Sequence, residues 1–379
     1  MALECVAQSH SVVAASTIEG EVLFARSYTF GGSFNSTQRE RLRKHLGTML
    51  SDVASFLGVR YAAFEGCQLC IGMSGVTFPL DRETSMPRCL KQMGINIGAE
   101  RLICTGDAET ILVSHTRTLS GMGLLCHSGS TAFVSNDSKF NRLGGWGPML
   151  GDEGSAHWMG MSALRYLADE YDQRIPWEDS SLWSYVDRWM SAPDCDIPEV
   201  QEASILWRRR IAEVEAGGFD PRTAVFSFLH QLERQWSVER RRQVVSKLVK
   251  PVMEAWSEGC GTAAKLVSDA ARLLVGQLAA LSEGLSEEFK SLPIVLYGEV
   301  FNHHPNFCEL VERELSNQMP WWTDGELLSI NSTGTLRPVL GGLLLASAKS
   351  TSSRYRLPES RVVENLKKTT NQFRELIND

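Results

Sequence analysis

The sequence predicts an α/β protein of two domains, with a long helical insertion in the second domain. The chain has 379 residues, enough for two domains of ~100–200 residues each. Short apolar runs alternate with helix-like segments over residues 1–117 and again after residue 288, which is the pattern of a layered α/β fold. Between these parts, over about 155–288, the apolar spacing is mostly helical.

The composition is that of an ordinary globular protein. Hydrophobic residues make up 43% and charged residues 22%, which excludes a disordered chain, a coiled coil and a collagen-like fibre. We expect one domain to cover 1–117, joined by a C-terminal helix within 355–379, and the other to cover 118–354. No internal repeat breaks this division.

Charge and cysteine usage narrow the class of partner and the compartment. The 38 basic and 45 acidic residues give a net charge of −7, so we expect no nucleic acid and no membrane as partner. No apolar stretch approaches the ~20 residues of a membrane helix, and no signal peptide is visible. The nine cysteines are scattered, several in apolar runs, which indicates reduced thiols and a cytoplasmic location. The CxxC pair, Cys67 and Cys70, lacks a second ligand pair, so we assign it no metal.

The elements of the first domain follow from local signals. Residues 11–30 contain two β-rich runs with Gly20 between them, which predicts a hairpin. Thr37 and Glu40 form a capping box, and the apolar spacing after it predicts a helix that ends near Gly58. We then expect strands at 68–74 and 101–104 and helices at 82–94 and about 105–115.

The second domain begins with a predicted hairpin at 122–134 and continues into the helical insertion. After the insertion we expect strands at 294–297 and 326–330, a loop at 298–304, and helices at 306–317, 339–347 and 359–377. Ligands of such folds bind at the carboxyl ends of the strands.

The sharpest motif is the segment 144–156, GGWGPMLGDEGSA. Five glycines in eleven positions, 144–154, permit tight turns and close backbone approach to a ligand. Asp152 and Glu153 lie just before the start of the following helix. Carboxylates there can accept hydrogen bonds from sugar hydroxyls, and they also interact favourably with the positive end of the helix dipole. The same residues are also compatible with a capped helix after a glycine-rich loop.

Extended to Trp158, this segment resembles the GGWGxxLGDEGSxxW signature of N-acetylglucosamine kinases and their relatives in the BadF/BadG/BcrA/BcrD ATPase family. The resemblance implies the sugar kinase/Hsp70/actin-like (ribonuclease H-like) fold, with two α/β domains around a cleft. It also implies ATP and Mg²⁺ as cofactors and phosphorylation of an amino sugar, N-acetylglucosamine first, at its 6-hydroxyl. Relatives are often homodimers, so a homodimer is a possible state.

On the sugar side, the resemblance implies that Asp107, in the turn 105–108, is the general base that takes the hydroxyl proton. A lone aspartate at a strand-to-helix turn is also compatible with a helix N-cap. The resemblance assigns the sugar site to Asn35, Ser74, Gly75, Gly145, Trp146, Asp152 and Glu153.

On the nucleotide side, the turn 128–130 matches the end of the family's SGTGS phosphate loop. His127 replaces a glycine there, and either donates to a phosphate when protonated or fills space, the interpretation we favour. The resemblance assigns the nucleotide site to Ser9, Ser11, Ser128, Gly129, Ser130, Gly298 and Gly341.

The first phosphate loop departs from the family pattern. Counting back from the hairpin places Cys5–Ser11 on that loop, with Cys5 where relatives have an aspartate and without the family's glycines. A cysteine is a poor substitute for the hard oxygen ligand that Mg²⁺ prefers. Three interpretations stay open: an active enzyme with a remodelled loop, a non-catalytic relative that binds sugar or nucleotide, or a chain that begins at the wrong residue.

The remaining clusters receive structural interpretations. The arginine runs 208–210 and 240–242 are expected to be solvated helix faces. Trp321 and Trp322 are expected to pack in a core or an interface, and His303 and His304 receive no metal role.

Overall fold

The computed structural model divides into two compact units. It describes residues 1–5, 11–28, 34, 39–76, 80–136, 139–175, 182–195, 197–283, 289–323, 325–329, 338–347, 349–351, 354–356 and 360–372. Unit 1 comprises Met1–Met122, Ser135–Phe140 and Ser332–Asp379, and unit 2 comprises Gly123–Val134 and Asn141–Asn331.

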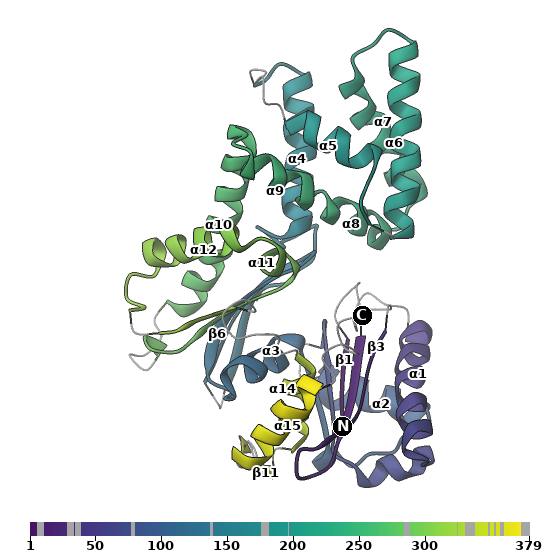
Figure 1. The fold of residues 1–379 in the computed structure, drawn as a ribbon, viewed down its shortest axis with the longest axis vertical. Coiled ribbons are helices and arrows are strands. Elements are labelled where there is room, and N and C mark those ends of the chain that lie inside the picture. Colours follow the sequence, from purple (N-terminus) through teal and green to yellow (C-terminus); the bar gives the residue numbers. More distant parts are fainter. Residues whose placement is uncertain are drawn as a thin grey trace. The chain divides into compact units, whose positions relative to one another are not determined.

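Unit 1 is built on a five-stranded sheet in the order β3-β2-β1-β4-β5 (Figure 1). The strands are β1 (Ala2–Cys5), β2 (Ser11–Ser16), β3 (Val22–Tyr28), β4 (Leu69–Met73) and β5 (Leu102–Thr105). The first three pair antiparallel, whereas β1, β4 and β5 run parallel to one another. The predicted hairpin and both predicted strands of this domain are confirmed.

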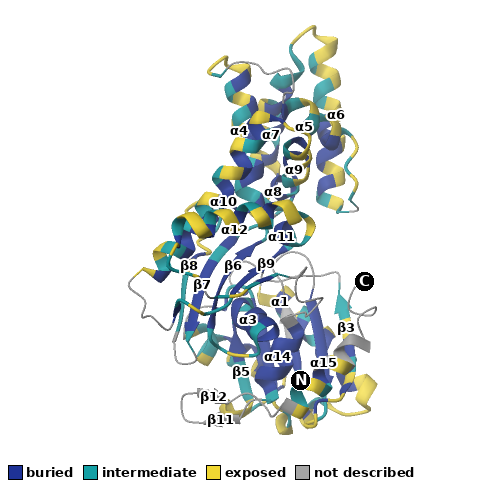
Figure 2. Ribbon diagram, turned by 60° about the vertical axis from the view of Figure 1, so that its left-hand side comes forward, coloured by how far each residue is buried: buried dark blue, intermediate teal, exposed yellow. Residues whose placement is uncertain are grey.

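Helices cover both faces of this sheet. On one face lies α1 (Arg39–Leu57), whose apolar stripe includes Leu42, Leu46 and Met49, together with α2 (Met86–Gln92). On the other face lie α3 (Asp107–Thr116), α14 (Pro338–Ser347) and α15 (Ser360–Gln372). Alternate residues of β2 point into the two cores, because successive side chains of a strand lie on opposite faces. Figure 2 shows α3 and α14 mostly buried where they cover the sheet.

Short elements connect these helices. They are the 3₁₀ turns Tyr61–Gly66 and Ala99–Arg101 and a π-type turn, Asp81–Ser85, that leads into α2. A small two-stranded sheet, β11 (Lys349–Thr351) with β12 (Arg354–Arg356), precedes α15 and was not predicted.

The helix α14 belongs to unit 1, not to the second domain as the predicted boundary at 354 required. It packs against α3, and a Cβ at Gly341 would lie only 1.8 Å from the carbonyl oxygen of Thr110. The two helices therefore approach backbone to backbone, which a side chain at residue 341 would prevent. This contact gives Gly341 a packing role, and its predicted contact with nucleotide stays a prediction.

Unit 2 is built on a second sheet, in the order β10-β9-β6-β7-β8. The strands are β6 (Gly121–Cys126), β7 (Ser130–Asn136), β8 (Lys139–Gly144), β9 (Ile294–Tyr297) and β10 (Leu327–Ser329). The predicted β6–β7 hairpin is confirmed. The strand β8 was not predicted, because KFNRLG has few apolar residues, yet it leads directly into the glycine-rich segment.

The predicted helical stretch after residue 155 forms seven helices among the described residues. They are α4 (Ala156–Tyr171), α5 (Leu182–Ser191), α6 (Pro198–Ala216), α7 (Ala224–Gln235), α8 (Val238–Lys247), α9 (Val249–Ser257) and α10 (Gly261–Ser282), with a 3₁₀ turn at Pro221–Thr223. Figure 1 shows α5 to α8 extending from the end of unit 2 away from its sheet.

After β9 the chain forms α11 (Glu299–His303) and α12 (Pro305–Gln318). The first of these lies where a loop was predicted, and the second confirms the predicted helix. None of the helices that the structure describes is long and apolar enough to cross a membrane.

Candidate active site

The parallel strands of unit 1 bring three predicted site segments to one edge of the sheet. Cys5 of β1 pairs with Met73 of β4, and Gly72 of β4 pairs with Thr105 of β5. Because the carboxyl ends of parallel strands meet at one edge, the start of the first loop, the Ser74–Gly75 turn and Asp107 lie along the same border. This border is the usual place for ligands in open α/β sheets.

Asp107 is the first residue of α3, and the N-cap position belongs to Gly106. Glu109 completes the helix start, since its Oε2 accepts a hydrogen bond from the Gly106 N–H at 3.1 Å. Arg82 holds the other Glu109 oxygen at 2.5 Å. The N-cap alternative for Asp107 is therefore wrong. Its carboxylate contacts the Ala108 N–H at 3.1 Å and is half-buried, and its role as base stays a prediction.

The Ser74–Gly75 turn is anchored to the chain next to Asn35. The Phe34 N–H donates to the carbonyl oxygen of Ser74 at 2.8 Å, and the Phe34 side chain is buried. Asn35 and Ser9, two of the predicted contacts, lie outside the described residues. Ser11 is the first residue of β2, opposite Cys5, and is fully buried.

In unit 2, the turn between β6 and β7 lies against the start of α4. The His127 N–H donates to the Gly129 carbonyl oxygen, and the Ala156 N–H donates to the His127 carbonyl oxygen, both at 2.9 Å. The turn 127–129 and the end of the glycine-rich segment are thus fastened to each other by backbone hydrogen bonds. This contact brings the predicted phosphate turn beside the predicted sugar loop within one unit.

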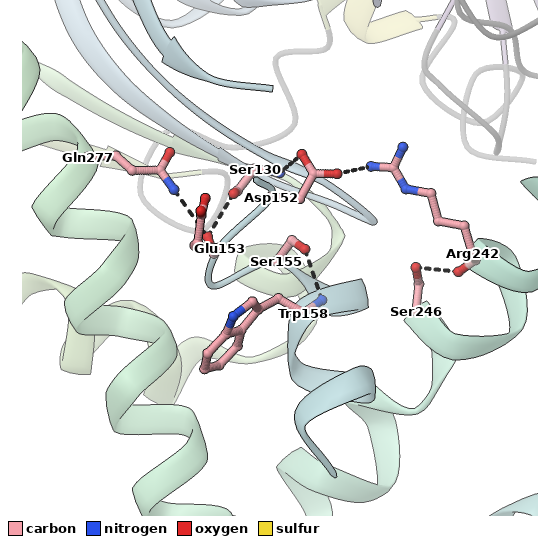
Figure 3. Close-up of polar contacts among 8 residues, drawn as sticks. All are labelled: Ser130, Asp152, Glu153, Ser155, Trp158, Arg242, Ser246 and Gln277. Atoms are coloured by element: carbon pink, nitrogen blue, oxygen red, sulfur yellow. Dashed lines mark hydrogen bonds and ion pairs between the residues drawn. The ribbon is translucent and has the colours of Figure 1, made fainter. Parts of the chain in front are cut away.

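Asp152 is the most constrained residue of the glycine-rich segment. Its φ is 61°, an uncommon conformation for a residue with a side chain, and only 2% of it is exposed. One carboxylate oxygen lies 2.6 Å from Nη2 of Arg242, and the other accepts the Ser130 N–H at 3.4 Å (Figure 3). Burial raises the pKa of Asp152, although Arg242 and the Ser130 N–H oppose that rise.

Glu153 is held through its backbone. Its carbonyl oxygen accepts from the Ser130 hydroxyl at 2.7 Å and from the Gln277 amide at 3.2 Å (Figure 3). The helix that follows is capped by Ser155, whose hydroxyl accepts the Trp158 N–H at 3.1 Å. Because Ser155 caps α4, helix capping does not explain the acidic pair Asp152 and Glu153.

The rest of the glycine-rich segment forms an open loop. The Gly145 N–H donates to the Ser130 carbonyl oxygen at 2.9 Å, which ties the loop to β7. Trp146, Met149 and Leu150 are all more than half exposed. The loop therefore presents an indole and two further apolar side chains to solvent.

His127 joins the turn 127–129 to the end of β9. Its Nδ1 accepts the Glu299 N–H at 3.3 Å, and its ring meets that of Tyr297 edge-on. A nitrogen that accepts a hydrogen bond carries no proton, so this contact favours the space-filling interpretation over the protonated donor. Burial pushes the pKa of Glu299 up, but the pKa lies below its usual value, with Lys247 at 3.1 Å as the largest opposing charge.

Arg242 is the residue that sequence reasoning missed. Arg240 fits the predicted solvated face, because it pairs with Glu202 at the surface. Arg242 does not, because its guanidinium is four-fifths buried against Asp152. The available signal was weak: Arg242 lies one turn before the buried Val245, so both occupy the inner face of α8.

The predicted site residues thus occupy both units. Asp107, Ser74, Gly75, Ser11 and Gly341 belong to unit 1, and Gly145, Trp146, Asp152, Glu153, Ser128, Gly129, Ser130 and Gly298 belong to unit 2. The site residues of unit 2 contact one another directly, because Ser130 hydrogen-bonds to Asp152, Glu153 and Gly145.

Comparison with known proteins identifies the family of this chain. The family model described as the BadF/BadG/BcrA/BcrD ATPase family matches residues 9–321. The chain belongs to this family. The glycine-rich segment lies within the matched residues, between the end of β8 and the start of α4, and it holds Asp152.

Two curated family relatives resemble part of the chain. An N-acetylmuramic acid/N-acetylglucosamine kinase of Clostridium acetobutylicum is 28% identical over 163 residues, which is 42% of this chain and 50% of that protein. An N-acetyl-D-glucosamine kinase of Dictyostelium discoideum is 33% identical over 110 residues, 28% of this chain and 34% of that protein. The chain therefore matches half or less of the length of these relatives.

Solved structures resemble nearly the whole chain in fold. A candidate N-acetylglucosamine kinase from Chromobacterium violaceum has a TM-score of 0.58 at 16% identity, covering 91% of this chain and 97% of that one. A similar candidate from Porphyromonas gingivalis has a TM-score of 0.56 at 13% identity, covering 89% and 97%. The predicted sugar kinase/Hsp70/actin-like fold is confirmed.

Proposed function

We propose that this protein is an ATP-dependent kinase of an amino sugar, with N-acetyl-D-glucosamine as its first substrate and the 6-phosphate as product. The observation that supports this most is the Asp152 carboxylate, buried and held in a left-handed backbone conformation between Ser130 and Arg242. Such conformations persist where the surrounding structure imposes them, and they cluster at ligand sites.

Asp152 suits the recognition of sugar hydroxyls. Its Oδ1 accepts a long hydrogen bond, 3.4 Å from the Ser130 nitrogen, and the Gly147 backbone also hydrogen-bonds to this carboxylate. Two carboxylate oxygens offer about four lone-pair sites, so the group retains capacity for hydroxyl donors. Charged acceptors form stronger hydrogen bonds than neutral ones. The exposed indole of Trp146, on the same loop, offers an apolar surface of the kind that covers a sugar ring.

Asp107 suits the acceptance of the hydroxyl proton. It follows the parallel strand β5 and is not used as the cap of α3. Phosphoryl transfer depends mainly on aligning the attacking hydroxyl and stabilising charge, and a positioned carboxylate does the first of these. We propose that Asp107 takes the proton as the sugar oxygen attacks the γ-phosphate.

The nucleotide would bind the small-residue turn Ser128–Ser130 through backbone N–H groups, with Gly298 close to it. Among the described residues, no group of three or more His, Cys, Asp or Glu side chains lies close enough to hold a metal ion. Mg²⁺ often binds through substrate phosphates with one or two carboxylates. We therefore expect the metal to arrive as part of MgATP.

The names of the relatives support the substrate class. Both curated relatives are named as kinases of N-acetylglucosamine, and one name adds N-acetylmuramic acid. Both substrates are N-acetylated amino sugars. This similarity, over half or less of each relative, makes N-acetylglucosamine the first sugar to test.

The test is ADP release by purified protein with MgATP and each of N-acetylglucosamine, N-acetylmuramic acid, glucosamine, N-acetylmannosamine, glucose or no sugar. We expect ADP release that depends on an N-acetylated amino sugar, with the 6-phosphate identified by NMR. Sugar binding without ADP release would instead identify a non-catalytic relative, the alternative raised by the unusual residues Cys5–Ser11. Neither binding nor ADP release would contradict both.

A further inference from the structure

Arg242 contacts the predicted sugar site from a helix that is remote in sequence. It lies on α8, 90 residues after Asp152, and its Nη2 is 2.6 Å from Oδ2 of that carboxylate. The two side chains are 20% and 2% exposed. The pair is therefore largely removed from water, where an ion pair is much stronger than at a surface.

The phosphate turn leaves room for this guanidinium. A Cβ at Gly129 would lie 2.3 Å from Nη2 of Arg242 and 2.9 Å from Oδ1 of Asp152. Any side chain at residue 129 would thus displace one partner of the ion pair. The absence of a side chain at Gly129 and the presence of Arg242 are two parts of one arrangement.

The backbone of Arg242 is held firmly. The Ser246 hydroxyl donates to its carbonyl oxygen at 2.6 Å (Figure 3), and His157 of α4 hydrogen-bonds to the same backbone. Close to this point, α8 touches α4 so tightly that a Cβ at Gly160 would lie 2.0 Å from the Val245 carbonyl oxygen. Since α4 begins directly after the signature, α8 is fixed relative to the signature.

The charged groups around Asp152 indicate what Arg242 does for this carboxylate. The charged side chains that act on this carboxyl are Arg242 of α8, which favours its ionised form, and its neighbour Glu153, which opposes it; the Ser130 and Gly147 backbone also favours the ionised form. Cys126 of β6 also senses the Asp152 charge, and burial raises the pKa of that thiol, so it is neutral. Arg242 is thus the cation that offsets burial of the carboxylate.

We propose that Arg242 is a positioning residue for the sugar, which holds the Asp152 carboxylate by Oδ2 so that Oδ1 remains directed at sugar hydroxyls. This inference rests on the proposed function. Arg242 acts through Asp152 and not by contact with the phosphates. The helical insertion therefore contributes to recognition of the sugar through α8.

The first test compares Arg242→Met and Arg242→Lys with Arg240→Met. Arg240 lies on the same helix, pairs with Glu202 at the surface, and is the matched control. We expect Arg242→Met to raise KM for the sugar about tenfold to a hundredfold, the usual scale for a hydrogen bond to a charged group. The KM for MgATP should stay unchanged, Arg242→Lys should restore part of the loss, and Arg240→Met should behave as wild type.

The second test keeps the inference open to contradiction if Arg242→Met fails to fold, because an unpaired buried carboxylate is strongly destabilising. The double variant Asp152→Asn/Arg242→Met removes both charges. If Arg242 acts through Asp152, the double variant binds the sugar no more weakly than Asp152→Asn alone, as measured by calorimetry. A further tenfold loss in the double variant would show direct contact with a ligand and overturn the inference.

A readout without sugar separates this inference from the proposed function. NMR of ¹³C-labelled aspartate carboxyls follows the titration of Asp152, assigned by the Asp152→Asn variant. We expect its pKa to be higher in Arg242→Lys or Arg242→Met than in wild type. An unchanged titration, or a rise in KM for MgATP alone, contradicts the positioning role. A wild-type protein without sugar-dependent activity contradicts the proposed function instead, whatever the titration shows.

Discussion

The Cα of Gly298 faces the carbonyl oxygen of Cys126 so closely that a Cβ would lie 2.1 Å from it. The φ of Gly298 is 132°, a conformation that residues with side chains rarely adopt. The contact joins the ends of β9 and β6. The next residue, Glu299, donates its backbone N–H to Nδ1 of His127. The turn after β9 and the predicted phosphate turn are therefore one packed assembly.

We predict that Gly298→Ala destabilises the protein by about 3 kcal/mol, because backbone strain and overpacking add at this position. Equilibrium unfolding in urea measures the change. Gly218→Ala is the matched control: its φ is 74°, yet nothing lies within 4 Å of a Cβ there, so we expect about 1 kcal/mol. Equal losses of unfolding free energy in both variants would show that the contact with Cys126 does not contribute to stability.

Asp107→Asn should lower kcat about a hundredfold to ten-thousandfold, the usual contribution of a general base. Sugar binding should be spared, because the amide keeps the shape and the start of α3 depends on Gly106 and Glu109. Coupled-assay kinetics and calorimetry measure the two effects separately. Normal turnover in this variant would remove Asp107 from the chemistry.

The ion pair between Lys247 and Glu299 lies at the turn that follows Gly298, with 3.1 Å between the two charged groups. We predict that Lys247→Met raises KM for MgATP about threefold to tenfold without changing KM for the sugar, since a part-buried pair contributes modestly. Lys250→Met is the control, because Lys250 pairs with Asp194 at the exposed surface. Equal effects of the two variants on MgATP would contradict a nucleotide role for this turn.

Stability should fall in acid through His157. Burial and the charge of Arg242 lower the pKa of His157 to about 4, from 6.5. The unfolded chain therefore binds more protons than the folded one between pH 6.5 and 4, and the free energy of unfolding decreases as the pH falls through that window. The loss from this group is up to about 3 kcal/mol. His304, with a pKa also lowered to about 4, adds a similar loss.

The check is urea unfolding at several pH values for wild type and His157→Gln. We expect a shallower dependence on pH between 6.5 and 4 in the variant, with the remaining slope due to His304 and other groups. Identical slopes would show that His157 titrates normally in the folded protein. Asp152 acts in the opposite direction, because its raised pKa lets the folded protein take up a proton before the unfolded chain does.

Much of unit 1 could be predicted from local patterns. The hairpin around Gly20, the helix ending at Leu57 and the strands before Ser74 and Asp107 each have their own apolar spacing and turn residues. The strand β8 and the helix α11 could not, because neither carries enough apolar periodicity to stand out from a loop.

The candidate site could also be predicted only in part. The glycine-rich signature and the strand ends that carry Ser74 and Asp107 are contiguous stretches, so their residue types can be recognised in order. The partners of these residues cannot, because they come from distant segments. Arg242 reaches Asp152 across 90 residues, and Glu299 reaches His127 across 172.

The sequence by itself determined the fold class, the family signature and most helices and strands, because spacing, caps and turn glycines act within a few residues. Only the tertiary structure decided that α14 belongs to unit 1 and that one arginine of a charged run is buried against Asp152. Both outcomes depend on how closely two helices approach: Gly341 of α14 packs against α3, and Gly160 of α4 packs against α8. How closely each pair of helices approaches depends on the shapes of packed surfaces far apart in the chain, and these shapes cannot be predicted from a local sequence pattern.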